Sequence, residues 1–279
     1  MNINFIKLSK INIVLSICLC VLSVISITYN KINLGLEFTS GLEIEIQCNN
    51  NIDINFFKKE LKDYKNIVIK HYGSQKHIQL KIKKTEKKKD EILKTIQTKI
   101  KNNGIILKIN YIGAEVNSSI ITDSINAIII AIISMFMYLS YRFNIQLSVS
   151  AILTLFHDVL ILIGLISFFE IELNLIVMSA IFAVFGYSVN DTVVIFDRIR
   201  ENIKIYHDRS IENIINISIN NTISRTLMTS ISTLIVTTIL ILFCGDHLFY
   251  FSIILSIGII VGTYSSIYIS TAILLLTKK

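Results

Sequence analysis

Apolar residues gather along this chain in six long runs that polar segments separate. A helix that crosses the hydrocarbon core of a bilayer needs about 20 predominantly apolar residues. Each run is close to that length. The runs cover residues 11–30, 124–141, 145–169, 173–190, 226–245 and 248–277. The pattern therefore predicts an α-helical membrane protein with six transmembrane helices.

The first run has an alternative interpretation as a cleaved signal peptide. Its uncharged stretch, residues 11–30, is long for the apolar core of a signal peptide, and residues 26–29 make a poor small-residue cleavage site. We therefore expect an uncleaved helix.

Residues 31–122 follow a different pattern, in which short alternating runs predict strands and longer runs with apolar residues at helical spacing predict helices. Strand patterns cover 42–47, 67–72, 77–82 and 105–112, and helix patterns cover 53–65 and 85–101. The order β-α-β-β-α-β is that of a small α+β ferredoxin-like domain. We thus expect a first transmembrane helix in 1–30, an external ferredoxin-like domain in 31–122, and the remaining five helices in 123–279.

The short loops between the predicted spans differ in charge, and Lys and Arg favour the cytoplasmic side of a membrane. If the N-terminus is cytoplasmic, the loops on that side contain Arg142, Arg198, Arg200 and Arg209. The two short outer loops then contain acidic residues and His247 but no Lys or Arg. This bias predicts that both termini are cytoplasmic and that 31–122 lies outside, in the periplasm.

The composition, 52% hydrophobic and only 17% charged, agrees with a membrane protein. The segment 31–122 holds 17 Lys and Arg against 10 Asp and Glu, so the net charge of +7 falls there. Nucleic-acid binding is not expected, because the basic segment lies outside and lacks interleaved aromatic residues. The four cysteines include no CxxC pair, so the sequence does not predict a metal or redox site. The sequence also contains no phosphate-binding loop, HExxH motif or serine-hydrolase motif, so it does not predict an enzyme.

The most unusual polar residues in the apolar runs are Asn190 and Asp191, because a carboxylate near hydrocarbon is costly and usually has a function. Arg225 begins the next run from the cytoplasmic side, so antiparallel neighbours would place it at a depth similar to that of Asp191. Such a pair can be a static interfacial ion pair or part of a proton relay. His157 and Asp158 lie near the middle of their run, where they can be a structural polar pair or a proton-handling site.

Two further patterns concern how the helices pack. Small residues three or four positions apart on a helix allow two helices to approach closely. Such residues are Gly258, Gly262 and Ser266 in the last run, and Ser179, Ala183 and Gly186 in the fourth. In the fifth run, hydroxyl residues such as Thr226 and Ser230 form a stripe that either bonds to the carbonyls of its own helix or lines a hydrated path.

Several motifs resemble those of the SecF family of bacterial protein-export membrane subunits, and the resemblance extends over nearly the whole chain. Residues 34–41, LGLEFTSG, are similar to the glycine-rich signature after the first span, with Gly35, Glu37, Phe38, Thr39 and Gly41 as matching residues. The most specific match is 185–202, FGYSVNDTVVIFDRIREN, and 156–159, 221–230 and 262–266 also fit. The chain departs from the family at Ser40, where glycine is usual, and in local turns at 113–116 and 244–246.

The resemblance implies a six-span subunit of the bacterial inner membrane that pairs with SecD. With SecD, it would use protons as the coupling ion, and no other cofactor, to help the SecY-SecE-SecG channel move polypeptides across the membrane. The family resemblance assigns proton passage to the residues matching Asp191 and Arg225. Two alternatives are a proton-coupled small-molecule exporter of the resistance-nodulation-division superfamily and a purely structural subunit.

Overall fold

The structure is a computed structural model that describes residues 3–48, 67–72, 74–83, 93, 98 and 104–277. The chain divides into two compact units. One unit comprises Met1–Asn33 and Ile128–Lys279, and the other comprises Leu34–Ala127.

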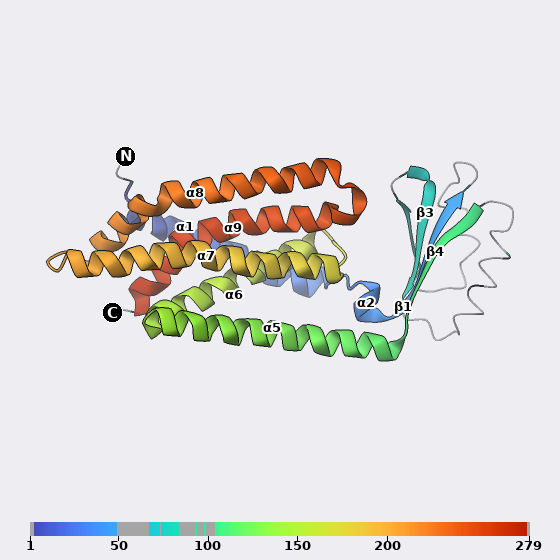
Figure 1. Cartoon of the computed structure of the whole chain (residues 1–279), viewed down its shortest axis with the longest axis horizontal. Helices are drawn as coiled ribbons and strands as arrows, with labels where there is room; N and C mark the ends of the chain where they lie inside the picture. The colour runs from blue at the N-terminus through green and yellow to red at the C-terminus, as the bar shows by residue number, and fades with distance from the viewer. Residues whose placement is uncertain are drawn as a thin grey trace. The chain divides into compact units, whose positions relative to one another are not determined.

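Long helices form the first unit (Figure 1). Six helices of the described residues are long and apolar enough to cross a membrane, which confirms the six predicted spans. They are α1 (Phe5–Asn30), α5 (Ala114–Arg142), α6 (Ile145–Phe168), α7 (Leu175–Ile205), α8 (Ile211–Phe243) and α9 (Gly245–Thr277). The first part of α5 belongs to the second unit.

Several helices extend beyond the apolar runs that predict them, because a helix continues until a capping residue or a turn ends it, whatever its polarity. Asn4 and Asn174 cap α1 and α7, since their side-chain oxygens accept hydrogen bonds from the backbone N–H groups of Lys7 (3.1 Å) and Val177 (2.9 Å). Ser210 caps α8 in the same way. The polar end of α7 and the first part of α8 are therefore helical although they lie outside the apolar runs.

The centre of the helical unit is the contact between α7 and α9. A Cβ atom added to Gly258 would overlap the side chain of Val184, and one added to Gly262 would lie 3.1 Å from Cβ of Ser188. Val184 is fully buried. The glycines thus allow the two helices to approach closely, as small residues do in membrane helices.

A second close contact joins α1 to α6. Gly164 of α6 leaves no room for a Cβ atom beside Ser23 of α1. Ser167 of α6 donates hydrogen bonds to the carbonyls of Ser26 (3.0 Å) and Lys31 (2.7 Å), where α1 ends. The first helix is therefore packed into the bundle by polar as well as apolar contacts.

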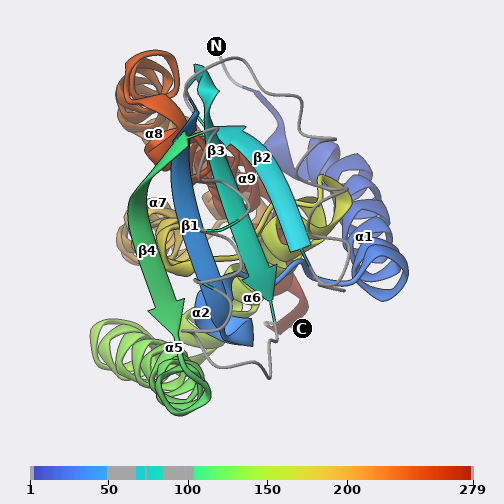
Figure 2. The ribbon, with the colours of Figure 1, turned by 90° about the vertical axis from the view of Figure 1, so that its right-hand side faces the viewer.

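The described part of the second unit contains a four-stranded sheet (Figure 2). Its strands are β1 (Gly41–Cys48), β2 (Ile67–Tyr72), β3 (Ser74–Lys83) and β4 (Gly104–Ile112), in the order β2-β3-β1-β4 with all neighbours antiparallel. The four predicted strands are confirmed. The helices predicted at 53–65 and 85–101 lie outside the described residues.

The two faces of the sheet differ in polarity because alternate residues of a strand point to opposite sides. One face carries a buried apolar cluster that includes Leu42, Ile44, Leu80 and Ile82. Cys48 belongs to this cluster, and its burial raises the pKa of the thiol, so that it behaves as a small hydrophobic residue.

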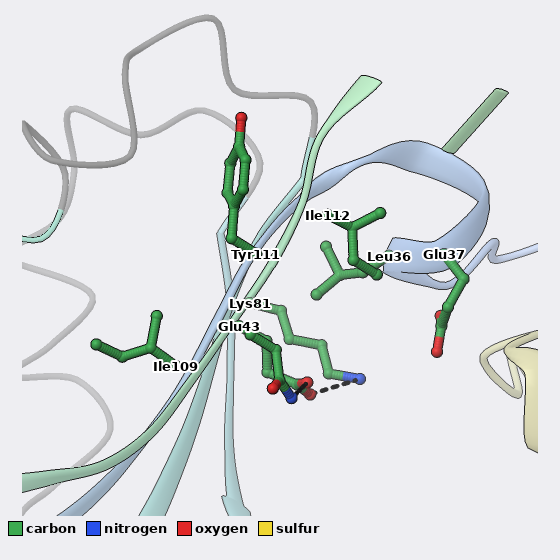
Figure 3. A pocket seen from close by; sticks show the side chains of 8 residues that line it. Leu36, Glu37, Glu43, Lys81, Ile109, Tyr111 and Ile112 are labelled. Carbon is green, nitrogen blue, oxygen red and sulfur yellow. Dashed lines mark hydrogen bonds and ion pairs between the residues drawn. The ribbon is translucent and has the colours of Figure 1, made fainter. Parts of the chain in front are cut away.

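The other face of the sheet is polar and centres on Glu43 of β1. Its carboxylate accepts hydrogen bonds from the side-chain amides of Gln79 (2.9 Å) and Asn110 (3.0 Å) and lies 3.5 Å from the ammonium group of Lys81. Glu43, Lys81 and Asn110 border a pocket of about 360 Å³ beside the short helix α2 (Leu36–Thr39) (Figure 3). The cross-strand contacts fix the register of the three strands.

Candidate functional site

Asp191 lies in the interior of the helical unit, on α7, with only 2% of its surface exposed. Its Oδ2 atom is buried and has no hydrogen-bond partner among the described residues. On a helix of 3.6 residues per turn, Asp191 points between the directions of Tyr187 and Ser188. Tyr187 faces α8, where it donates to Ser230, and Ser188 faces α9, beside Gly262. Asp191 is therefore directed toward the space that α7, α8 and α9 surround.

Two side-chain contacts fix the register between α7 and α8. The hydroxyl of Tyr187 lies 3.1 Å from the hydroxyl of Ser230, and the amide of Asn202 lies 2.8 Å from the hydroxyl of Ser218. Because the helices run antiparallel, residues just before Ser230 in α8 lie level with Asp191. Those residues include Arg225 and Thr226.

Arg225 lies near the level of Asp191, but the two side chains form no direct ion pair in the described part of the chain. The two residues differ in their surroundings, since Asp191 is buried and Arg225 is exposed on the outer side of α8. A buried carboxylate without a hydrogen bond or a direct ion pair is a costly arrangement. Among the described residues, Oδ2 of Asp191 therefore makes no hydrogen bond that would hold a neighbouring helix.

The hydroxyl stripe on α8 mostly follows the structural interpretation and also contacts α7 and α9. Thr229 and Thr233 donate to carbonyls of their own helix, as the structural interpretation expects. Ser230 also contacts Thr263 of α9 at 2.7 Å and accepts from Tyr187. Thr226 differs, because its buried hydroxyl has no hydrogen-bond partner among the described residues.

His157 and Asp158 form a second polar cluster, in which the side chain of Asp158 is fully buried. Oδ1 of Asp158 lies 2.9 Å from Nδ1 of His157, and Oδ2 accepts hydrogen bonds from Ser188 (2.6 Å) and Ser265 (2.8 Å). Nε2 of His157 makes a hydrogen bond with the hydroxyl of Ser16. The cluster thereby joins α1, α6, α7 and α9, and both oxygens of Asp158 have partners.

A short hydrogen-bonded chain connects this cluster to the surroundings of Asp191. Ser266 of α9 donates to the carbonyl of Ser188 (3.1 Å) and also lies 2.9 Å from the hydroxyl of Thr192. Thr192 follows Asp191 directly on α7. The position of α7 around Asp191 is therefore fixed by contacts that continue from the Asp158 cluster.

Asn190 and the small residues of α7 lie on another face of the same helix. A Cβ atom added to Gly186 would meet nothing within 4 Å. A surface groove of about 510 Å³ lies between α5 and α7, and Gly186 and Asn190 border it. The small residue Gly186 on α7 thus faces outward, whereas Gly258 and Gly262 pack inside the chain.

The signature residues after the first span form a tight connection into β1. Gly35 precedes the single turn of α2, and its carbonyl accepts hydrogen bonds from the backbone of Phe38 (3.1 Å) and the hydroxyl of Thr39 (2.9 Å). The carbonyl of Glu37 accepts from the side chain of Asn117 at 2.6 Å. Gly41 has φ 144°, and a Cβ atom there would overlap the carbonyl of Ile82. Glycine is therefore required where β1 begins.

Ser40 also has a positive φ of 58°, with ψ 160°, a conformation that glycine adopts far more readily than serine. The glycine that the resemblance to the SecF family implies at this position would fit the same turn without strain. The departure is thus a local cost and leaves the connection intact.

Comparison with known proteins gives the family. The model of the C-terminal region of SecD/SecF protein-export membrane proteins matches residues 92–279. The chain belongs to the SecD/SecF family. The SecF translocase subunit of Rickettsia prowazekii is 33% identical over 280 residues, which cover 98% of this chain and 90% of the relative. The SecF subunit of Calditerrivibrio nitroreducens is 35% identical over 288 residues, which cover 100% of this chain and 95% of the relative.

Solved structures of the same family have the same fold. The crystal structure of SecDF, a translocon-associated membrane protein from Thermus, matches with a TM-score of 0.88 and 26% identity. A SecDF structure in a super-membrane-facing form matches with a TM-score of 0.73 and 25% identity. Each match covers the whole of this chain but only 39% of the SecDF chain. Its six apolar helices and its family make this chain a multi-pass membrane protein.

Sequence reasoning identified Asp158 and His157 but not their partners Ser16, Ser188 and Ser265. A serine in an apolar helix has the same appearance in a sequence whether it bonds to its own helix or to a distant carboxylate. The four-residue spacing of Gly262 and Ser266 indicated a close helix contact at this level of α9. It did not indicate that Asp158 lies on the other side of that contact.

Proposed function

We propose that this SecD/SecF-family chain is a SecF-type subunit that uses the proton-motive force to assist protein translocation. The observation that supports the proposal best is Asp191, a buried carboxylate with no hydrogen bond to Oδ2 among the described residues and with Arg225 within electrostatic range. Arg225 is the only arginine in the sequence of α8, and its charge favours the ionised form of a nearby carboxylate. Asp191 and Arg225 then form the part of the relay that exchanges a proton.

The partner in this proposal is a SecD-type chain. This chain covers 39% of the SecDF polypeptide that it resembles. The larger part of that polypeptide therefore has no counterpart in this chain. The outward-facing Gly186 of α7 and the groove beside it fit the close approach of a helix from another chain. The SecY-SecE-SecG channel and emerging polypeptides would be further partners, because the similar SecDF protein from Thermus is a translocon-associated membrane protein.

A pair of glycine substitutions separates contacts inside the chain from contacts with that partner. Gly258→Val places a side chain against Val184 and is expected to lower the stability of the isolated chain by about 1–3 kcal/mol. Gly186→Val adds the same atoms at a position with nothing within 4 Å, so the isolated chain should keep its stability but co-purify less SecD-type partner. Thermal stability in detergent and the yield of the complex measure the two effects. Equal loss of stability in both variants contradicts the assignment of the two faces.

The sheet order supports a ferredoxin-like domain. β1 and β2 run parallel with β3 between them, and β3 and β4 run parallel with β1 between them. Parallel strands of one sheet need crossover connections, usually helices. Residues 49–66 and 84–103 make these connections, and the proposal places one helix in each. An external domain over 31–122 would then contact emerging chains.

The orientation in the inner membrane is also part of the proposal, with both termini cytoplasmic. The Arg-rich ends of α5 and α7, which meet where Arg142 contacts Asp197 at 3.1 Å, support a cytoplasmic location for that end of the bundle. Single cysteines replacing the exposed residues Lys76 and Arg209, in a background without the native cysteines, test this arrangement. An impermeant thiol reagent should label position 76 from the periplasm and position 209 only after the membrane is opened. Labelling of both from one side contradicts it.

The function itself is tested in vesicles that contain the complex and the Sec channel. A proton gradient should stimulate the completion of translocation, and an ionophore should remove that stimulation. A small-molecule exporter, the alternative function, would show gradient-dependent efflux of dyes or drugs from vesicles without the Sec channel. Efflux without any effect on translocation would replace the proposal with that alternative.

A further inference from the structure

Two buried polar atoms without hydrogen-bond partners lie at the same level of the bundle. Oδ2 of Asp191 and Oγ1 of Thr226 both lack a partner among the described residues, and the two residues are 2% and 1% exposed. The contact between Tyr187 and Ser230 fixes the register of α7 and α8. It lies about one helical turn from Asp191 on α7 and from Thr226 on α8. Thr226 is therefore level with Asp191 on the neighbouring helix.

Both side chains point toward the same space. Thr226 lies four residues before Ser230 and so on the same side of α8, where Ser230 contacts Thr263 of α9 and Tyr187 of α7. Asp191 lies four residues after Tyr187 on the corresponding side of α7. The residues of α9 at this level are Gly262, which lies beside Ser188, and Ser266, which contacts Thr192.

The free hydroxyl of Thr226 is unusual for α8. Thr222, Thr229 and Thr233 each donate to a carbonyl three or four residues earlier in the same helix, which is the ordinary solution for a threonine in an apolar helix. Among the described residues, Thr226 does not use that solution. A buried polar atom without a partner is energetically costly, so two such atoms at one level indicate a polar ligand shared between them.

We propose that Asp191 and Thr226 hold a water molecule between α7, α8 and α9, and that Thr226 is a positioning residue for proton transfer at Asp191. Buried waters make about two to four hydrogen bonds to polar groups that otherwise lack partners. A water here donates to the Asp191 carboxylate and exchanges a hydrogen bond with the Thr226 hydroxyl. A proton reaches Asp191 by passing from this water to Oδ2, while the water takes a proton from solvent on the side of Arg225.

The other titratable groups at this level have assigned contacts. Tyr187 on α7 donates to Ser230, and Arg225 on α8 is exposed. Tyr264 on α9 donates to the carbonyl of Asn12 on α1, so its hydroxyl serves another contact. Asp158 on α6 is enclosed by its own donors. Asp191 is thus the group that the water serves.

The inference rests on the proposed function, and the test separates the two. The complex with the SecD-type partner is prepared with wild-type chain, Thr226→Val, Thr226→Ser and Asp191→Asn. Infrared difference spectra are recorded between two pH values. The carboxylic-acid band that is absent from the spectrum of Asp191→Asn is assigned to Asp191. Proton-gradient-dependent export is measured in the same preparations.

Thr226→Val keeps the shape of the side chain and removes the hydroxyl, so the Asp191 band should move to the higher frequency of a less hydrogen-bonded carboxyl group. The gradient-dependent part of export should fall about tenfold, the effect of losing one hydrogen bond to a reacting group. Thr226→Ser retains the hydroxyl and should keep both signals close to wild type. If Thr226→Val does not assemble, Thr226→Ala removes the hydroxyl without adding bulk and replaces it.

An unchanged band and unchanged export in the variants without a hydroxyl overturn the water site while leaving Asp191 as the proton carrier. A band that responds to sodium at constant pH also overturns it, because a cation then binds where the water is proposed. Full gradient-dependent export in Asp191→Asn instead overturns the proposed function itself.

Discussion

Asp191→Asn is expected to abolish the proton-gradient-dependent part of export while the complex still assembles. The substitution retains the shape of the side chain and removes the group that can bind and release a proton. Among the described residues, Asp191 has no hydrogen bond at Oδ2 to lose and no direct ion pair, so folding should change by less than about 1 kcal/mol. Export with and without an ionophore, together with the yield of the complex, measures both effects.

A matched control is available on the same helix. Asp197→Asn makes the same chemical change six residues later, where the carboxylate is partly exposed and pairs with Arg142 (3.1 Å) and Arg200 (2.9 Å). Surface ion pairs contribute little, about 0–1 kcal/mol, so this variant should keep its response to the gradient. If Asp191→Asn also keeps its full response, Asp191 is a structural residue, and the relay would have to involve the His157–Asp158 pair or the partner chain.

The comparison of Asp191 with Arg225 shows how far the sequence alone could go. Counting residues from the loops predicted that the two lie at similar depth, and the contacts Tyr187–Ser230 and Asn202–Ser218 agree with that estimate. The count could not tell that Arg225 is exposed and Asp191 buried, because depth along a helix does not specify which way a side chain points. The rotation of α7 and α8 about their axes depends on contacts with α9.

The fold was predictable where periodicity determines structure directly. The alternation in 42–47 and the apolar runs of the spans produced the correct strands and membrane helices. The ends of the helices were not predictable from hydropathy, because α7 continues through polar residues to Ile205 and α8 begins at Ile211, before its apolar run. The sheet order depends on contacts between distant strands, for example between Glu43 and Asn110, which no local pattern specifies.

The small residues illustrate a similar limit. Small residues recur at similar spacing in α7 and α9, yet Gly258 packs against Val184 inside the chain and Gly186 faces outward. Spacing indicates that a helix can approach closely, and the partner is decided by the other faces of both helices. Gly164, which lies against Ser23, was not singled out by the sequence pattern, because one small residue in an apolar run does not specify a neighbour.

Asp158 is expected to be the carboxylate on which the bundle depends for stability. Its two oxygens accept from His157, Ser188 and Ser265, and through Ser16 the cluster reaches α1. Asp158→Leu removes every acceptor and leaves buried donors unpaired. Ser265 can still donate to the carbonyl of Gly262 (3.0 Å), but His157 and Ser188 lose their contacts to the carboxylate. Removing one member of a buried charged network costs about 3–5 kcal/mol, enough to prevent stable folding of many proteins.

Thermal unfolding of the chain in detergent, followed by the loss of monodisperse protein, measures this effect beside Asp191→Asn. We expect a large loss for Asp158→Leu, an intermediate loss for Ser188→Ala, and little change for Asp191→Asn. This order follows from the hydrogen bonds that each change removes. Ser188→Ala removes one of the donors to Oδ2 of Asp158, which should lower the free energy of unfolding by about 1 kcal/mol. Asp158→Leu protein that is as stable as wild type, but that has lost its response to the proton gradient, would instead place Asp158 in the proton path.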